Sequence, residues 1–143
     1  MQENQSASLE TEKKAMMDRV LKERGFRYGL HKILTEGDWE CMQKFEEWVE
    51  FVYTKERHLD RRVKELIITA IILTLRSSAE HVQAHMNAAV RAGATKEELI
   101  VVAELVGHWG GTVAFANALE CWRQVFAPQL PPAFKPLPAG QQA

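Results

Sequence analysis

Cysteine is scarce in this sequence, and no two cysteines lie close together. The 143 residues include only Cys41 and Cys121, which are eighty positions apart and belong to no CxxC motif. The sequence therefore shows neither a redox-active dithiol nor a cysteine-based zinc site. We expect two reduced and largely buried thiols, because free cysteine behaves as a small apolar residue.

The chain also lacks an excess of charge and a long apolar run. Eighteen basic and nineteen acidic residues leave a formal net charge of -1, which gives no electrostatic reason to bind nucleic acid or an anionic membrane. The longest apolar run, 66–75, is interrupted by Thr69 and Thr74 and is shorter than the roughly 20 residues that cross a bilayer. The polar N-terminal segment MQENQSASLETEKK does not resemble a secretory signal, so we expect a cytoplasmic protein.

Proline is absent before the C-terminal tail, and hairpin signals such as Asn-Gly or Asp-Gly are absent throughout. All five prolines lie in the segment APQLPPAFKPLPAGQQA that follows Phe126. This tail cannot be helical, so we expect it to be disordered or to lie extended on a neighbouring surface. Without hairpins, the rest of the chain is predicted to be all-α.

Helix start and stop signals divide that part into six expected helices. The first runs from about Ser8 to Gly25, and the last from Thr112 to Phe126. The helix after Asp60 is apolar on nearly every side, as expected of an element surrounded by others. The signals for the remaining boundaries are an N-cap at Asp38, capping boxes at Ser77/Glu80 and Thr95/Glu98, and helix ends at Gly93 and Gly110-Gly111.

Four side chains on two of these helices suggest a metal site. His81 and His85 are spaced i, i+4, and so are Glu104 and His108 on the following helix. The short turn between these helices predicts antiparallel neighbours. If the two faces converge, they would suit zinc, iron or manganese. The competing interpretation is ordinary histidines that form hydrogen bonds at helix surfaces.

Two carboxylates and a basic segment also have alternative interpretations. Glu80 is either a capping residue or an acid beside His81. Glu65 begins the most apolar helix, where it is either a first-turn acid favoured by the helix dipole or a partner that exchanges protons with a histidine. The basic residues Arg61, Arg62 and Lys64 either complement an anionic substrate or form a solvated face.

Two segments together resemble the carboxymuconolactone decarboxylase family, which includes the alkylhydroperoxidase D-like proteins. They are LDRRVKELIITAIILTL and HMNAAVRAGATKEELIVVAELVGHWGG, and the resemblance covers roughly residues 45–125. It implies an all-α, alkylhydroperoxidase D-like bundle of about six helices with active sites between helices. On this basis we expect an N-terminal helical arm (1–25), the family domain (26–127) and a Pro-rich tail (128–143).

The peroxidase-like branch of this family does not fit. There a CxxC motif precedes the histidine that His85 resembles, and a glutamate like Glu65 completes a proton relay. The two cysteine positions are Ser78 and His81 in this chain. Since serine cannot cycle through a disulfide, the protein is not expected to be a cysteine peroxidase.

The decarboxylase branch implies a different chemistry. Its members lack the CxxC motif but keep a histidine like His85 and a glutamate near the start of the helix. In this chain Glu80 lies one position away from the place expected for that glutamate. The resemblance implies that His85, with Glu65 or Glu80, moves protons on a small carboxylated lactone or related organic acid, with no cofactor. Protonated His81 and His108 are the candidates to stabilise the enolate that decarboxylation leaves.

Two other functions stay open. One is a metal-dependent enzyme that uses His81, His85, Glu104 and His108; the other is a non-catalytic member whose histidines only satisfy hydrogen bonds. All three hypotheses predict a homo-oligomer, because 46% hydrophobic residues is a high share for so short a chain. The resemblance implies a dimer, trimer or hexamer.

Overall fold

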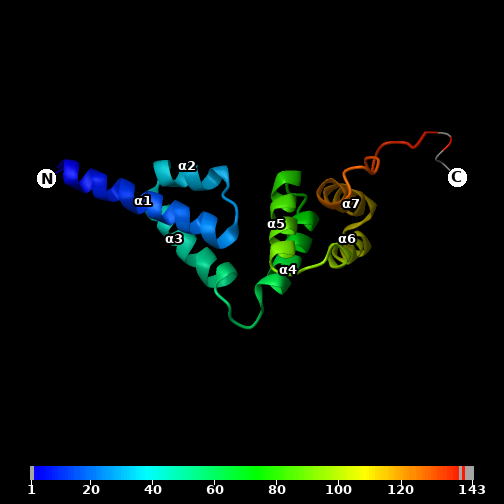
Figure 1. Ribbon diagram of the computed structural model, residues 1–143, viewed down its shortest axis with the longest axis horizontal. Helices are drawn as coiled ribbons and strands as arrows, with labels where there is room; N and C mark the ends of the chain where they lie inside the picture. The colour runs from blue at the N-terminus through cyan, green and yellow to red at the C-terminus, as the bar shows by residue number, and fades with distance from the viewer. Residues whose placement is uncertain (1, 139, 141–143) are drawn as a thin grey trace. The chain divides into compact units, whose positions relative to one another are not determined.

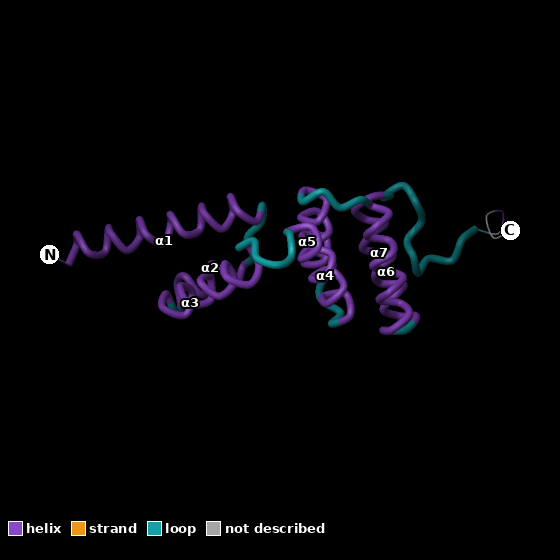
Figure 2. The backbone as a smooth tube through the Cα atoms, turned by 90° about the horizontal axis from the view of Figure 1, so that it is seen from below, coloured by secondary structure: helices purple, strands orange, loops and turns teal. Residues whose placement is uncertain are grey.

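The computed structural model describes residues 2–138 and 140, and every regular element in this part is helical, which confirms the all-α class (Figures 1 and 2). No helix in it is both long and apolar enough to cross a membrane. Seven α-helices and a π-helical turn, η1, are described, one α-helix more than expected. Their bounds are α1 (Gln2–Arg24), α2 (Gly29–Gly37), α3 (Trp39–Val49), η1 (Glu50–Thr54), α4 (Arg61–Thr74), α5 (Ala79–Arg91), α6 (Lys96–Gly110) and α7 (Thr112–Phe126).

The chain forms two compact units, Met1–Arg57 and His58–Ala143. The first contains α1 to η1, and the second contains α4 to α7 and the C-terminal tail. The domain limits expected at 25/26 and 127/128 therefore fall inside these units. Residue 1 of the expected arm and residues 139 and 141–143 of the expected tail lie outside the described residues.

Most helix boundaries follow from local capping that the sequence predicts. The Asp38 carboxylate accepts a hydrogen bond from the backbone of α3, and Asp60 does the same for α4. Thr95 and Glu98 form the expected capping box at α6. Gly93 has a φ of +97°, the left-handed conformation expected where α5 ends. These caps confirm that short-range contacts set the helix limits.

The capping box predicted at Ser77 and Glu80 is wrong by one residue. Ser78 caps α5 by accepting from the backbone N–H of His81. The reason lies in the preceding turn, where Arg76 takes a left-handed φ of +56° and the Ser77 N–H donates to Ile72 O at 2.9 Å. This Schellman-type ending of α4 uses Ser77, so the next serine becomes the cap.

Two other expectations need correction. The sequence signals missed α2, which begins after Tyr28, a residue type that is not a usual helix cap. The thiol of Cys41 is exposed, whereas Cys121 is buried as expected. Cys41 lies on α3 next to Met42, which is one of the two buried residues of that helix.

The second unit has an apolar core made by α4 to α7. Its fully buried members include Met86, Ala89, Leu99, Ala103 and Ala118. In Figure 2, α4 lies beside α5 and α6 beside α7.

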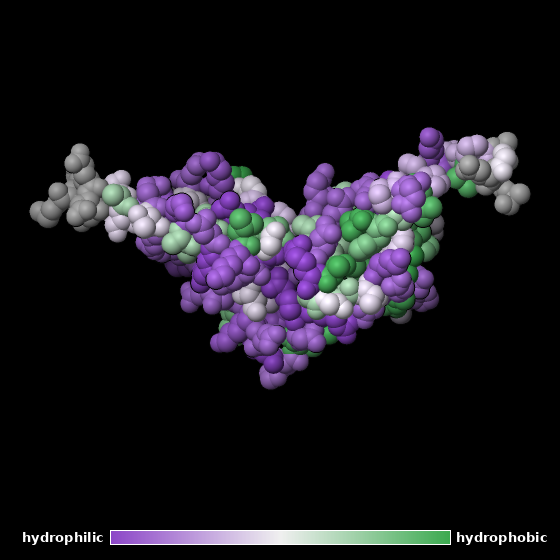
Figure 3. All heavy atoms as spheres, in the orientation of Figure 1, coloured by the Kyte–Doolittle hydropathy of each residue, from purple (hydrophilic) through white to green (hydrophobic). Residues whose placement is uncertain are grey.

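One side of α4 stays uncovered in the single chain. Ile67, Ile71 and Leu75, spaced i, i+4, i+8, are 44%, 51% and 73% exposed. The expectation that α4 is enclosed on all sides is therefore wrong for one chain. Figure 3 shows hydrophobic residues gathered on the surface of this unit.

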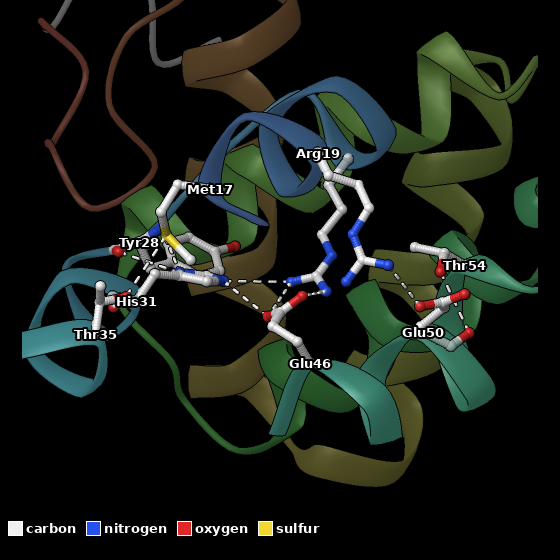
Figure 4. Close-up of polar contacts among 9 residues, drawn as sticks. Met17, Arg19, Tyr28, His31, Thr35, Glu46, Glu50 and Thr54 are labelled. Carbon is white, nitrogen blue, oxygen red and sulfur yellow. Dashed lines mark hydrogen bonds and ion pairs between the residues drawn. The ribbon is translucent and has the colours of Figure 1, made fainter. Parts of the chain in front are cut away.

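The first unit is built around buried charges (Figure 4). Arg24 of α1, His31 of α2 and Glu46 of α3 are each at least 95% buried. Arg24 donates to both carboxylate oxygens of Glu46, at 3.2 and 2.5 Å, and His31 Nε2 lies 3.4 Å from Glu46 Oε1. Burial raises the pKa of Glu46, but the hydrogen bonds and charges of His31 and Arg24 outweigh it and lower that pKa overall. This cluster joins all three α-helices of the unit.

The start of the proline-rich tail is fastened to α7. The Arg123 guanidinium donates to the carbonyl oxygens of Pro128 and Leu130, and the Ala133 N–H donates to Glu120 at 2.7 Å. Hydrogen bonds from Arg123 and from the Ala133 backbone lower the pKa of Glu120 to about 2. The first part of the tail therefore lies on α7, with turns at 128–130 and 133–135 in place of the expected extended form.

Candidate functional site

The centre of the candidate site is a buried carboxylate–imidazole pair between α4 and α5. Glu65 Oε2 lies 2.8 Å from His85 Nδ1, and the two side chains are 0% and 8% exposed. Arg61 Nε donates to the other carboxylate oxygen, Oε1, at 2.7 Å. The sequence analysis proposed Glu65 as a proton-exchange partner of a histidine, and the structure brings these two residues together.

Helix geometry explains why these groups meet. Arg61, Glu65 and Thr69 are spaced i, i+4, i+8, so they lie on one face of α4. Glu65 and Thr69 are completely buried on that face. Because a buried carboxylate is costly without hydrogen bonds, its contacts with Arg61 and His85 are what make its position tolerable.

His81 lies one turn before His85, with the ring centroids 5.2 Å apart. Its Nδ1 is 2.6 Å from the Oγ of Ser77. Partial burial lowers the pKa of His81, and the charge of His85 lowers it further. The lowered pKa favours the neutral imidazole, which can act as a base or a hydrogen-bond donor, over the cation that the sequence analysis proposed.

Glu80 is placed apart from the pair. It lies exposed in the first turn of α5, where hydrogen bonds from its own backbone N–H and from Ser78 lower its pKa. Its charge also acts on Cys121, whose pKa is raised mainly by burial and further by Glu120 and Glu80. This placement fits the helix-start interpretation of Glu80.

The structure does not gather the four residues of the metal hypothesis. Glu104 and His108 are exposed on α6, and the His108 ring packs against Trp109 with centroids 5.0 Å apart. Among residues 2–138 and 140, no group of three or more His, Cys, Asp or Glu side chains is arranged to hold a metal ion.

The basic segment before Glu65 divides between two roles. Arg61 faces the buried carboxylate, whereas Arg62 forms an ion pair with Glu98 of α6. Arg61 is thus the one of these two that belongs to the site.

Ser77 is a site residue that the sequence analysis missed. It was interpreted as a cap because Glu80 follows three residues later, yet its hydroxyl contacts the His81 ring. Ser77 precedes the cap of α5, so its contact with His81 depends on the turn at Arg76 and not on helix spacing.

Comparison with known proteins bears on this region. The sequence model of the carboxymuconolactone decarboxylase family matches residues 40–124, more than half of the chain, and this range includes Glu65, Ser77, His81 and His85. No curated protein and no solved structure matches the chain significantly.

Proposed function

The chain belongs to the carboxymuconolactone decarboxylase family, and from this premise we propose that it moves protons on a small carboxylated lactone or related organic acid. The observation that carries the proposal is the buried contact between Glu65 and His85 at 2.8 Å. A carboxylate that accepts the Nδ1 proton fixes the orientation of the imidazole. Nε2 is then the atom that exchanges a proton with the substrate.

The proposed reaction needs one proton per turnover. The carbon–carbon bond to the substrate carboxylate breaks, CO₂ leaves, and the electron pair remains as an enolate conjugated with the lactone carbonyl. His85 Nε2–H then protonates the enolate carbon, and water returns the proton to His85. Arg61 holds Glu65 in place as a positioning residue, and neutral His81 donates a hydrogen bond to the enolate oxygen. No cofactor takes part in these steps.

A cysteine peroxidase mechanism is not part of the proposal. Cys41 and Cys121 are free thiols in different units. Burial raises the pKa of Cys121, which disfavours the thiolate that such chemistry requires.

We also propose that the protein acts as a cytoplasmic homo-oligomer. The exposed stripe of Ile67, Ile71 and Leu75 on α4 is matched by Val101, Leu105 and Trp109 on α6, which are 49%, 56% and 85% exposed at the same i, i+4, i+8 spacing. Exposed apolar residues repeated along one face of a helix are typical of subunit interfaces. Native mass spectrometry of untagged protein tests this by subunit count, and a monomer at micromolar concentration would contradict it.

The direct test is CO₂ release from carboxymuconolactone and a panel of related carboxylated lactones. Glu65→Gln and His85→Gln should each reduce kcat by about 10²–10⁴-fold, the usual contribution of a positioned acid or base. His58→Gln, at an exposed histidine outside the site, is the matched control and should keep full activity. The proposal fails if the wild type releases no CO₂ from the panel, or if His85→Gln is as active as the wild type. A stoichiometric metal in the native mass spectrum, lost in His85→Ala, would instead support a metalloenzyme.

A further inference from the structure

Ser77 and His81 form a contact that the proposed decarboxylation does not use. Their Oγ and Nδ1 atoms are 2.6 Å apart, a short hydrogen bond between a hydroxyl and an imidazole. Both side chains are half-buried, so part of each is exposed to solvent.

The backbone holds Ser77 in a fixed position. Its N–H donates to Ile72 O at 2.9 Å, and the residue before it, Arg76, is in the left-handed conformation that an arginine rarely adopts. This turn directs the Ser77 hydroxyl back to the first turn of α5, where His81 lies.

His81 also contacts a second histidine. Its ring packs against that of His85, which Glu65 holds at 2.8 Å. A hydroxyl within hydrogen-bond distance of a neutral imidazole is the central element of an activated nucleophile. The lowered pKa of His81 keeps its ring neutral and able to accept a proton at neutral pH.

We propose that Ser77 is a nucleophile and His81 its general base, so that the site accepts acyl groups from activated esters and lactones. This is an acyl-transfer activity that goes beyond the proposed proton transfer and does not require decarboxylation. The pair takes compounds whose leaving oxygen departs readily, such as aryl esters and enol lactones.

The proposed reaction has two stages. Ser77 Oγ attacks the carbonyl carbon while its proton passes to His81 Nδ1, and the carbon–oxygen bond to the leaving group then breaks as that oxygen takes the proton from His81. The product is an acyl ester on Ser77. In the second stage water attacks this ester, its proton passes through His81 to Ser77 Oγ, and the carboxylic acid leaves.

The test uses 4-nitrophenyl acetate as the probe with the full chain. Intact mass spectrometry should show the addition of one acetyl group, and peptide mapping should place it on Ser77. Ser77→Ala should lose the adduct, Ser77→Cys should regain it as a thioester, and His81→Gln should slow acylation by about 10²–10⁴-fold. Ser78→Ala is the matched control, because it removes a neighbouring hydroxyl that bonds the His81 backbone and not its ring, and it should keep the adduct.

Specific outcomes overturn the proposal. An adduct on lysines or on the histidines alone, no adduct at all, or an acylation rate unchanged in Ser77→Ala would each refute it. Circular dichroism of each variant verifies the helical fold, and Ser77→Cys provides a nucleophile even if alanine disturbs the turn. If the wild type forms the Ser77 adduct but releases no CO₂, only the proposed decarboxylation is refuted. The failure of either proposal can therefore be told from the failure of the other.

Discussion

Replacing Glu46 with leucine should strongly destabilise the first unit and leave the stability of the second unit unchanged. The variant leaves the Arg24 guanidinium buried without its carboxylate partner. Breaking a buried pair from one side typically costs about 3–5 kcal/mol, because an uncompensated charge remains in the interior. A unit the size of Met1–Arg57 has a free energy of unfolding of about 3–9 kcal/mol. The loss is therefore a third or more of the whole and leaves this unit marginal at best.

Urea unfolding followed by tryptophan fluorescence measures this effect. Trp39 and Trp48 lie on α3 of the first unit, so a background with Trp109→Phe and Trp122→Phe reports that unit alone. Far-ultraviolet circular dichroism of the same samples reports the helices of both units, so a transition that it shows and the fluorescence does not belongs to the second unit. The expected result is a transition of the first unit at much lower urea and an unchanged transition of the second.

Two controls isolate the buried charge. Glu47→Leu changes the neighbouring exposed glutamate and should alter stability by no more than about 0.5 kcal/mol. The double variant Arg24→Met/Glu46→Leu removes both charges and should recover most of the loss, since apolar replacements of a whole buried pair are often neutral. The reasoning is refuted if Glu46→Leu is as stable as the wild type, or if the double variant is as unstable as the single one.

Three further predictions concern acid and the ends of α4 and α7. The pKa of Glu46 in the folded protein is lowered from about 4.5, so its contribution to the free energy of unfolding is fully present above that pH and is lost as pH falls through the lowered pKa. Acid titration followed by Trp39 and Trp48 fluorescence should therefore show the first unit becoming less stable below pH 4.5. Arg76→Gly should raise stability by about 1 kcal/mol in thermal unfolding, because glycine adopts a φ of +56° without the steric cost of a side chain, and an unchanged or lower Tm would contradict this. Glu120→Gln should release the tail and speed chymotrypsin cleavage after exposed Phe134. In the wild type the attachment of the tail to α7 should weaken only as pH falls from about 4.5 towards 2. Equal cleavage rates in the wild type and in Glu120→Gln would exclude this role for Glu120.

The sequence predicts the helix limits better than the contacts between helices. Asp38, Asp60 and Thr95 were recognised because each caps a backbone group only three residues away. The helix after Tyr28 was missed because its start lacks that chemistry. Ser77 matched a capping-box pattern equally well, and only the left-handed turn at Arg76 decides which serine is the cap.

The candidate site was predicted in part for the same reason. Glu65 and His85 were each singled out, but their pairing depends on how α4 packs against α5, which spacing along one helix does not contain. The metal hypothesis depends on helix packing in the same way. The pair His81/His85 on one helix and the pair Glu104/His108 on the next can meet only if the two helix faces that carry them are turned towards each other. Glu104 and His108 face solvent instead.

The buried charges of the first unit give the two halves of the chain different responses to temperature. Unfolding the second unit exposes an apolar core and should carry a large positive heat-capacity change, whereas unfolding the first exposes a core centred on Arg24, His31 and Glu46 and should carry a smaller one. The stability curve of the second unit is then strongly domed, and its hydrophobic stabilisation weakens on cooling. The half that contains Glu65 and His85 is therefore the half that we expect to be sensitive to cold.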